Sequence, residues 1–435
     1  MPSAENSPPR AKTPSEPPVR LRRSPHPYKG MIAICSDIDG TNIDAFRAIH
    51  RYLNTLGKTA IGRGVGLDIA DSMWFYKMRG SPDLAFFRGH SWKRPSAVAQ
   101  EIIHYAKSGW IDTLHTYGNF NLGARRVVEF TREHAVAALA VSQQSGISFR
   151  VWANHGDRNN HQNIGRSNDA QGDRPDSPAY HADLIRRHGI EFLWGTGRSD
   201  PPGGPSVIEH RRLNDGQPMF FFDRHHWRKD YPDAAALAET YRLNHVIDRN
   251  GNSFLQVWHP QALPFQLSEP MLQQIAEEGR LCIFGQHLGY RWKPPGFEPR
   301  VAEVFRRLRD YQDQGLILVA RTSRLLHYNR VREFLKFSVV AEEQKLTLNI
   351  EAVDDPVRGY WVPGIEDLRG IGFETASGVE VELCLRGKPF KQDELTSASA
   401  GGVATIGIRW FAPAFEDRTH PFLARERSTE VGPRV

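Results

Sequence analysis

The sequence predicts a mixed α/β protein, with a (β/α) barrel that is deformed or seven-stranded and a small all-β, sandwich-like domain after it. Two observations predict the barrel. Apolar strand-like runs alternate with helix-like stretches up to about residue 337, and polar motifs follow directly after several of these runs. Repeated strand–helix units with short connections favour parallel strands. Beyond residue 337 the pattern changes to period-two alternation with glycine-rich turns, which is typical of antiparallel strands.

The alternation gives the expected elements. The first strand is a continuous apolar run over 31–36, and a helix is expected over 46–56. The later strands are also short apolar runs, expected at 110–114, 148–153, 190–194, 281–285 and 316–320. The remaining helices have helically spaced apolar residues and are expected at 95–107, 125–143, 180–188, 269–278, 301–312 and 324–337. In a barrel of such units the functional site lies at the carboxyl ends of the strands.

The length and local composition predict the domain organisation. A chain of 435 residues exceeds what one hydrophobic core normally supports. We expect the barrel over residues 30–337 and the β-rich domain over 338–416. Residues 1–29 are rich in Pro, Ser, Arg and Glu and lack a periodic apolar face, so we expect them, like residues 417–435, to be disordered tails.

Composition and charge exclude several classes of protein. Hydrophobic residues make up 40% and charged residues 24%, as in ordinary globular proteins. The net charge of +6 comes largely from the N-terminal tail and scattered arginines, without the basic stripe and interleaved aromatics of a nucleic-acid-binding protein. The three cysteines lie far apart in apolar runs and are expected to be buried thiols. With no apolar run long enough to span a bilayer and no signal-peptide core, we expect a cytoplasmic protein without a transmembrane segment.

An acidic motif follows the first strand. Asp37 and Asp39 stand two residues apart in Ser36–Thr41. If the strand geometry continues, both carboxylates point to the same face, so that one can hold a cation while the other acts as a base. The alternative is an Asx turn that caps the next helix.

A histidine motif follows the strand expected at 110–114. His115 and Asn119 are four residues apart, with Tyr117 between them. If the chain turns helically after His115, the two side chains converge like paired metal ligands on one helix face. The alternative is a histidine in the core.

A third motif follows the strand expected at 148–153. The segment Trp152–Asn163 contains His155, Asp157, Arg158 and His161. Turn-capping asparagines can explain some of its polar residues, but not His155, Asp157 and His161 together. We therefore expect it to contribute to a site.

A fourth motif, Ile283–Tyr290, closes a late buried strand with His287. An imidazole titrates near neutrality and can give a proton to a leaving group. A structural histidine is the alternative.

An irregular, aromatic-rich segment over 68–92 interrupts the alternation, and a long insert in a compact domain is often functional. It is expected to be either a substrate-covering lid or a second packing cluster. The candidate substrate-binding residues lie in this insert or after expected strands: Trp74, Tyr117, Asp157, Arg158, His161 and Arg321.

The order of the four motifs resembles the polysaccharide deacetylase family of carbohydrate esterases, over about residues 31–337. The resemblance implies a divalent metal on a deformed (β/α) barrel, and the removal of acetyl groups from amino sugars in a glycan or glycan precursor. It also implies that Asp37 is the general base, Asp39 and His115 are metal ligands and His287 is the general acid. Zn²⁺ is the expected metal, with Co²⁺, Ni²⁺ or Mn²⁺ as alternatives.

The sequence departs from the family pattern at three places. The usual adjacent aspartates are here Asp-x-Asp, Asn119 replaces the last histidine of the His-Ser/Thr-x-x-His motif, and Asn154-His155-Gly156 stands where an Arg-x-Pro-Tyr motif is usual. An amide oxygen is a poorer zinc ligand than an imidazole. The third ligand is therefore either Asn119 or His155.

Two other functions remain open on the sequence. Asp37–Thr41 also resembles the Asp-x-Asp-Gly-Thr signature of haloacid dehalogenase-type phosphatases, in which the first aspartate is the nucleophile. That chemistry needs a late acidic pair in the same domain, and the Asp-Asp of this chain, Asp354-Asp355, lies in the β-rich part. The second alternative is a non-catalytic sugar-binding barrel, which the loss of the histidine at position 119 favours.

Overall fold

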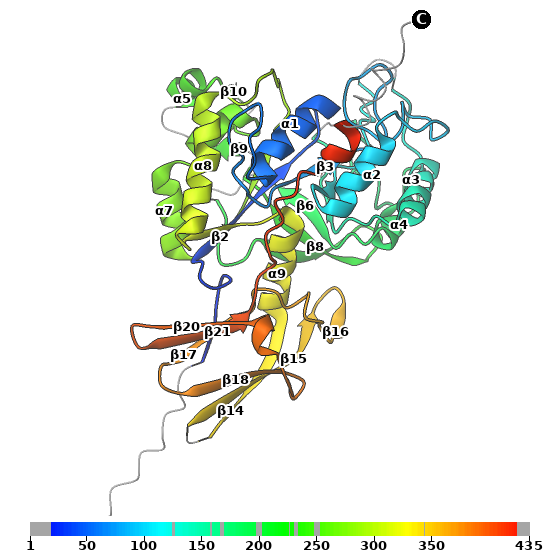
Figure 1. Cartoon of the computed structure of the whole chain (residues 1–435). Coiled ribbons are helices and arrows are strands. Elements are labelled where there is room, and N and C mark those ends of the chain that lie inside the picture. The colour runs from blue at the N-terminus through cyan, green and yellow to red at the C-terminus, as the bar shows by residue number, and fades with distance from the viewer. Residues whose placement is uncertain are drawn as a thin grey trace, which may run out of the picture.

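The computed structural model describes residues 19–123, 127–156, 159–165, 169–196, 202–225, 227–229, 234–247, 253–342 and 344–423. It has the mixed α/β class that the sequence predicts, with several sheets. Figure 1 shows a larger α/β part and a smaller β part, connected by α9 (Thr322–Phe334).

The largest sheet in the described part of the chain has nine strands in the order β12-β2-β3-β4-β5-β6-β8-β7, with β13 paired to β2. Every pairing is parallel except that of the edge strand β7 with β8. The strands are β2 (Gly30–Ser36), β3 (Ala70–Met73), β4 (Ile111–Leu114), β5 (Val151–Trp152), β6 (Phe192–Thr196), β7 (Ile208–Arg212), β8 (Pro218–Asp223), β12 (Leu281–Gln286) and β13 (Ile317–Val319).

Both faces of the central strand β2 are buried, as expected for a strand in a parallel sheet. Met31, Ala33 and Cys35 on one face share an apolar cluster with side chains of β5, β6, β8 and β12. Ile32 and Ile34 on the other face pack in a second cluster with residues of α1, α7 and α8. The end of β8 also connects with β12, because His225 N donates to Ile283 O at 2.7 Å and Gly285 N donates to His225 O at 2.9 Å.

Seven of the helices in the described residues occur near segments where the apolar spacing predicts them, although the helix expected over 125–143 begins only at Arg132. The helices are α1 (Ile43–Asn54), α2 (Ala99–Ser108), α3 (Arg132–Ser145), α4 (Ala182–Arg187), α5 (Ala234–Tyr241), α6 (Leu263–Gln266), α7 (Glu269–Glu278) and α8 (Pro299–Asp313), with α9 as above. Of these, α5 and α6 were not predicted. Asn42 begins α1 by accepting a hydrogen bond from Ala45 N through its side chain, so the acidic motif leads directly into a capped helix. None of the helices in the described residues is both long and apolar enough to cross a membrane.

Several strands were not predicted. β3 lies inside the aromatic insert, and β7 and β8 occupy a segment for which no element was expected. A small three-stranded sheet of β9 (Trp227–Lys229), β10 (Asn244–Ile247) and β11 (Ser253–Gln256) precedes a short 3₁₀ turn at Pro260–Ala262.

The β part contains two sheets. The first comprises β14 (Leu335–Ala341), β15 (Lys345–Asp355), β16 (Gly359–Trp361), β18 (Glu380–Leu385) and β19 (Lys388–Pro389). The second comprises β1 (Arg20–Leu21), β17 (Gly372–Ala376), β20 (Leu395–Ala400) and β21 (Val403–Ile408), with a 3₁₀ turn at Gln392–Glu394 before β20. The rings of Phe337 and Phe373 join the two sheets, with centroids 4.8 Å apart. The strands pair antiparallel as expected, except that β15 and β18 are parallel.

The predicted tails and boundary need correction. Residues 19–29 belong to the structure, because Arg20 and Leu21 pair with β17, and the expected boundary at residue 338 falls inside β14. The chain after β21 returns to the α/β part, where Asp417 pairs with Arg51 at 2.9 Å and Phe422 contacts Tyr105 (Figure 1). Residues 417–423 are therefore packed rather than disordered. Residues 1–18 and 424–435 lie outside the described residues.

Candidate metal centre

The carboxyl ends of β2, β4, β5 and β12 bring four sequence motifs together. Asp37 and Asp39 follow β2, His115 follows β4, His155 lies just beyond β5 and His287 follows β12. Parallel strands end at the same edge of a sheet, so these residues meet although they are far apart in the sequence.

Asp39, His115 and His155 form a group that could hold a metal ion. Each offers one ligand atom, and these atoms lie within 4.8 Å of one another. His115 Nε2 is 3.0 Å from Asp39 Oδ2, and His155 Nε2 is 3.0 Å from Asp39 Oδ1. Of the two predicted alternatives for the third ligand, His155 lies in this group and Asn119 does not belong to it.

The imidazole of His115 is oriented for ligation. Its Nδ1 is 3.0 Å from the carbonyl oxygen of Ala153, so a neutral ring that donates there would present its Nε2 lone pair to a metal ion beside Asp39. Trp74 supports both rings from behind, with its centroid 5.8 Å from that of His115 and 5.7 Å from that of His155. Burial alone would raise the pKa of Asp39, but the two imidazoles outweigh it and hold the pKa well below its usual value.

Hydrogen-bonded asparagines hold the loop that carries His155. Asn163 Oδ1 accepts from His155 N and Asn163 Nδ2 donates to His155 O, while Asn154 Oδ1 accepts from Trp152 Nε1 and Ile164 N. The density of asparagine in this motif therefore has a structural cause, because these side chains fix the backbone beside a ligand.

Asp37 is clamped by an arginine that the sequence reasoning missed. Arg224 follows β8 and donates from Nη1 to Asp37 Oδ1 at 2.9 Å and from Nη2 to Oδ2 at 2.6 Å. The ring of Trp194 covers the guanidinium at 3.8 Å. Burial would raise the pKa of Asp37, but Arg224, with help from His115 and His287, keeps it well below the usual value. Asp37 is thus a fixed anion.

His287 lies between the carboxylates and the open side of the site. Its Nε2 is 3.5 Å from Asp37 Oδ2 and its Nδ1 is 3.8 Å from Asp39 Oδ2. The side chains of His287 and Asp39 are 14% and 22% exposed, whereas that of Asp37 is 2% exposed. The first two can therefore touch a bound molecule directly, and Asp37 can do so only through the interior of the site.

The helical turn expected after His115 does not form. Thr116 has a positive φ of 52°, and Tyr117 O then accepts hydrogen bonds from Phe75 N and Tyr76 N. The amide oxygen of Asn119 consequently accepts from Asn121 N within its own turn.

Two expected substrate-binding residues are core residues. Tyr117 is 0% exposed and its ring packs against Phe130, so it offers no surface for a substrate. Trp74 is 1% exposed, so it forms a wall behind the ligands and is not part of an outer lid. At Trp74, the aromatic insert therefore forms a packing cluster, which is one of the two predicted possibilities, and not a substrate-covering lid.

The remaining candidates do not join the centre. His161 Nδ1 is 3.3 Å from Glu129 at the surface. Arg321 lies at the opposite end of the strands, where it pairs with Asp68 and donates to Gly109 O. Asp157 and Arg158 lie outside the described residues.

Comparison with models of known protein families and with curated protein sequences finds no match to this chain. Its function must therefore be inferred from the geometry of the centre.

Proposed function

We propose that the chain is a metal-dependent hydrolase of the polysaccharide deacetylase type, which removes an acyl group from the nitrogen of an amino sugar in a glycan or glycan precursor. One observation carries the proposal. Three groups that can ligate a metal, Asp39, His115 and His155, meet at the carboxyl ends of parallel strands, with a second carboxylate and a further histidine beside them.

We further propose that the nine-stranded sheet curls into a deformed (β/α) barrel with a β-sandwich appended. Side chains of β2 share one apolar cluster with those of β5, β6 and β8, which are not neighbours of β2 in the sheet, as the inward-facing residues of a barrel do. The two hydrogen bonds at His225 join β8 to β12 and so link the two ends of the parallel series.

The donor set suits a transition metal. Two imidazole nitrogens and one carboxylate oxygen match the three-ligand sites of catalytic zinc, which keep one coordination position open. Asp39 Oδ2 is buried and makes no hydrogen bond of good geometry within the described structure, although His115 Nε2 lies 3.0 Å away, so a cation bound by both groups would satisfy this oxygen. Zn²⁺ is the proposed ion, and Co²⁺, Ni²⁺ and Mn²⁺ are alternatives with similar ligand preferences.

The flanking residues have complementary roles. When bound, a divalent ion would polarise the acyl carbonyl and make a bound water more acidic. Asp37 orients this water and accepts its proton, and Arg224 keeps the carboxylate ionised and in place. His287, on the open side, donates a proton to the departing nitrogen. The low pKa of Asp37 makes it a weak base, so the acidity of the water must supply much of the driving force.

Aromatic rings at the opening support a carbohydrate substrate. Trp258 is half-buried and its ring centroid lies 4.4 Å from that of His287, while Tyr290 packs edge-on against Trp258 at 5.0 Å. Partly exposed aromatic faces beside a reactive centre can stack on the C–H face of a sugar ring.

The phosphatase alternative has less support. Asp37 would have to attack the substrate phosphorus directly, but its carboxylate is 2% exposed and both its oxygens are held by Arg224, a position from which a base can still act on a water molecule. Asp355 of the late acidic pair is bound to Arg330 and Trp361 in the β part.

Metal analysis of the purified chain tests the proposal together with acetate release from N-acetylglucosamine oligomers. We expect about one equivalent of metal in the wild type, loss of metal in Asp39→Asn and His155→Ala, and retained metal without turnover in Asp37→Asn. Asn119→Ala is the matched control, because within the described residues its side chain hydrogen-bonds to Asn121 N in its own turn, and this variant should keep its metal. A wild type without bound metal, or a His155→Ala variant with full occupancy, would contradict the proposal.

A further inference from the structure

A second cavity lies at the opposite end of the strands from the metal centre. Its lining includes Asp68, which precedes β3, and Trp110, which precedes β4, whereas His115 follows β4. At about 3.3 Å per residue, five residues along β4 separate the two sites by roughly 16 Å. This basal cavity, which we define by Asp68, Trp110, Arg321, Arg324 and the C-terminal stretch 410–418, is independent of the proposed hydrolase.

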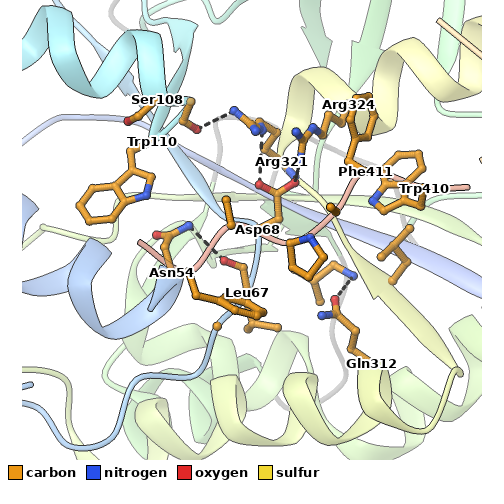
Figure 2. A pocket seen from close by; sticks show the side chains of 18 of the residues that line it. Asn54, Leu67, Asp68, Ser108, Trp110, Gln312, Arg321, Arg324, Trp410 and Phe411 are labelled. Atoms are coloured by element: carbon orange, nitrogen blue, oxygen red, sulfur yellow. Dashed lines mark hydrogen bonds and ion pairs between the residues drawn. The ribbon is translucent and has the colours of Figure 1, made fainter. Parts of the chain in front are cut away.

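The lining of the basal cavity carries an excess of positive charge. Its charged residues are three arginines, Arg321, Arg324 and Arg418, and one carboxylate, Asp68. Figure 2 shows Arg321 and Arg324 both pointing from the start of α9 toward Asp68. Arg324 Nη1 donates to Asp68 Oδ2 at 2.7 Å, and Arg321 Nε is 3.3 Å from Asp68 Oδ1. Asp68 thus serves two guanidinium groups, and Asp112, buried nearby, also acts on both of them electrostatically. Arg418 pairs with Glu416, which is 67% exposed.

The arginines have donors left for another acceptor. Arg321 Nη1 donates to Gly109 O at 3.0 Å and its Nε faces Asp68 Oδ1 at 3.3 Å, while Arg324 uses Nη1 for Asp68. Within the described residues, the Nη2 groups of both arginines make no hydrogen bond and can donate to an anion in the cavity. Burial lowers the pKa of Arg324, although Asp68 partly opposes this, so its charge sits in a desolvated setting.

The size and walls of the cavity suit a small anion. Its volume is about 120 Å³, and since one buried water needs roughly 10–15 Å³ there is room for about ten waters. Trp110 forms one wall, and Trp410 and Phe411 form another (Figure 2). Phe411 also packs under the guanidinium of Arg324 at 4.0 Å. Such walls keep the cavity only partly hydrated, which strengthens charge-assisted hydrogen bonds.

We propose that the basal cavity binds a phosphate group, held by the guanidinium forks of Arg321 and Arg324 with Arg418 at its rim. Arginine forks match the oxygens of phosphate in pairs. The group is either free inorganic phosphate or the phosphoryl end of a small metabolite. Because Trp410 and Phe411 belong to the returning C-terminal stretch, the bound anion also fastens this stretch to the base of the α/β part.

Thermal unfolding of the full chain tests this site. Sodium phosphate should raise the melting temperature along a saturating curve, and sodium chloride at equal ionic strength should not. Glucose 6-phosphate is the second probe. A greater rise in melting temperature with this ester points to a phosphorylated metabolite, and a greater rise with phosphate points to the free ion. Either result supports the site. No specific shift with either probe would overturn it.

Two variants and a control locate the effect. Arg324→Gln should weaken phosphate binding at least tenfold. Arg418→Gln, at the rim and so less of a risk to folding, should weaken it several-fold. Arg306→Gln removes an exposed arginine of α8 whose partner is Glu303, and it should bind phosphate like the wild type. Equal phosphate shifts in all three variants would mean a general salt effect and would overturn the proposal.

Discussion

Replacing Arg224 by Met should test how the centre holds its second carboxylate. The substitution keeps most of the side-chain volume but leaves Asp37 buried without its partner. The side chains of Arg224 and Asp37 are 1% and 2% exposed and are joined by two short hydrogen bonds. Breaking a buried ion pair costs about 3–5 kcal/mol. Because His115 and His287 remain within 3.6 Å of the Asp37 carboxylate, we expect the lower end, about 3 kcal/mol.

Urea denaturation of the metal-free chain, followed by tryptophan fluorescence, measures this cost. The pH dependence of this cost shows whether the Asp37 carboxylate is stabilised or destabilised by its surroundings. In the wild type the pKa of Asp37 lies below its unfolded value of 3.8, so the pair stabilises the fold above that pH and the contribution is lost as the pH falls further. In Arg224→Met burial should raise the pKa of Asp37 instead, so the deficit relative to the wild type should shrink as the medium is made acidic.

A double-mutant cycle with Asp37→Asn isolates the interaction energy of the Arg224–Asp37 pair. Arg306→Met is the control for the loss of an exposed arginine, and it should lower the free energy of unfolding by less than about 1 kcal/mol. The double variant should be destabilised by less than the sum of the single variants. The reasoning is refuted if Arg224→Met unfolds within about 1 kcal/mol of the wild type at neutral pH, or if the two substitutions are additive.

Three further predictions concern acidity, backbone and metal. Burial lowers the pKa of both His181 and His188 to about 4, against 6.5 when unfolded, so the unfolded chain gains protons first as the pH falls. For each histidine, the free energy of unfolding should fall by up to about 3 kcal/mol as the pH is lowered from 6.5 to 4. Denaturation curves recorded over that pH range check this. Gly118→Ala would put a Cβ 2.2 Å from Tyr76 O, so it should lower the free energy of unfolding by about 1–3 kcal/mol and reduce metal occupancy. Gly146→Ala is the control: with open space around it, this substitution should strain only its own backbone and leave metal occupancy unchanged. Removing the metal with a chelator should lower the melting temperature, because the free energy of metal binding no longer stabilises the fold. That stabilisation is about 2.7 kcal/mol for an ion present at 100 times its Kd. An unchanged melting temperature would contradict a bound structural or catalytic ion.

The sequence specifies those elements whose start and end signals are local. The helix expected over 269–278 occurs at those residues because Ser268 precedes it, Pro270 lies in its first turn and Gly279, with φ 63°, ends it. β2 is equally clear, since an apolar run stops at an acidic motif. In contrast, β3 reads Ala-Asp-Ser-Met, and its two polar residues hide a strand that is buried throughout.

Which residue joins Asp39 and His115 in the candidate metal group depended on one backbone angle. The spacing of His115 and Asn119 predicts convergence only if the chain turns helically, and the positive φ at Thr116 directs it back to Tyr76 instead. A left-handed threonine has no reliable sequence signal, because its conformation is imposed by the neighbouring strand. His155 could be proposed as the alternative because it follows the next parallel strand, where geometry requires no special turn.

Arg224 shows what kind of residue a single sequence cannot reveal. It follows a run of three phenylalanines and an aspartate, which reads as an ordinary buried strand, and 187 residues separate it from the carboxylate that it binds. Nothing in local spacing connects them; the connection arises because β8 and β2 end at the same edge of one sheet. Burying Asp37 without a cation would force it to take up a proton, so the site requires some arginine or lysine at a neighbouring strand end. Among the described residues, the cation comes from Arg224, which lies outside the four motifs found in the sequence. The missing positive charge was therefore the one signal that could have led to Arg224 before the structure.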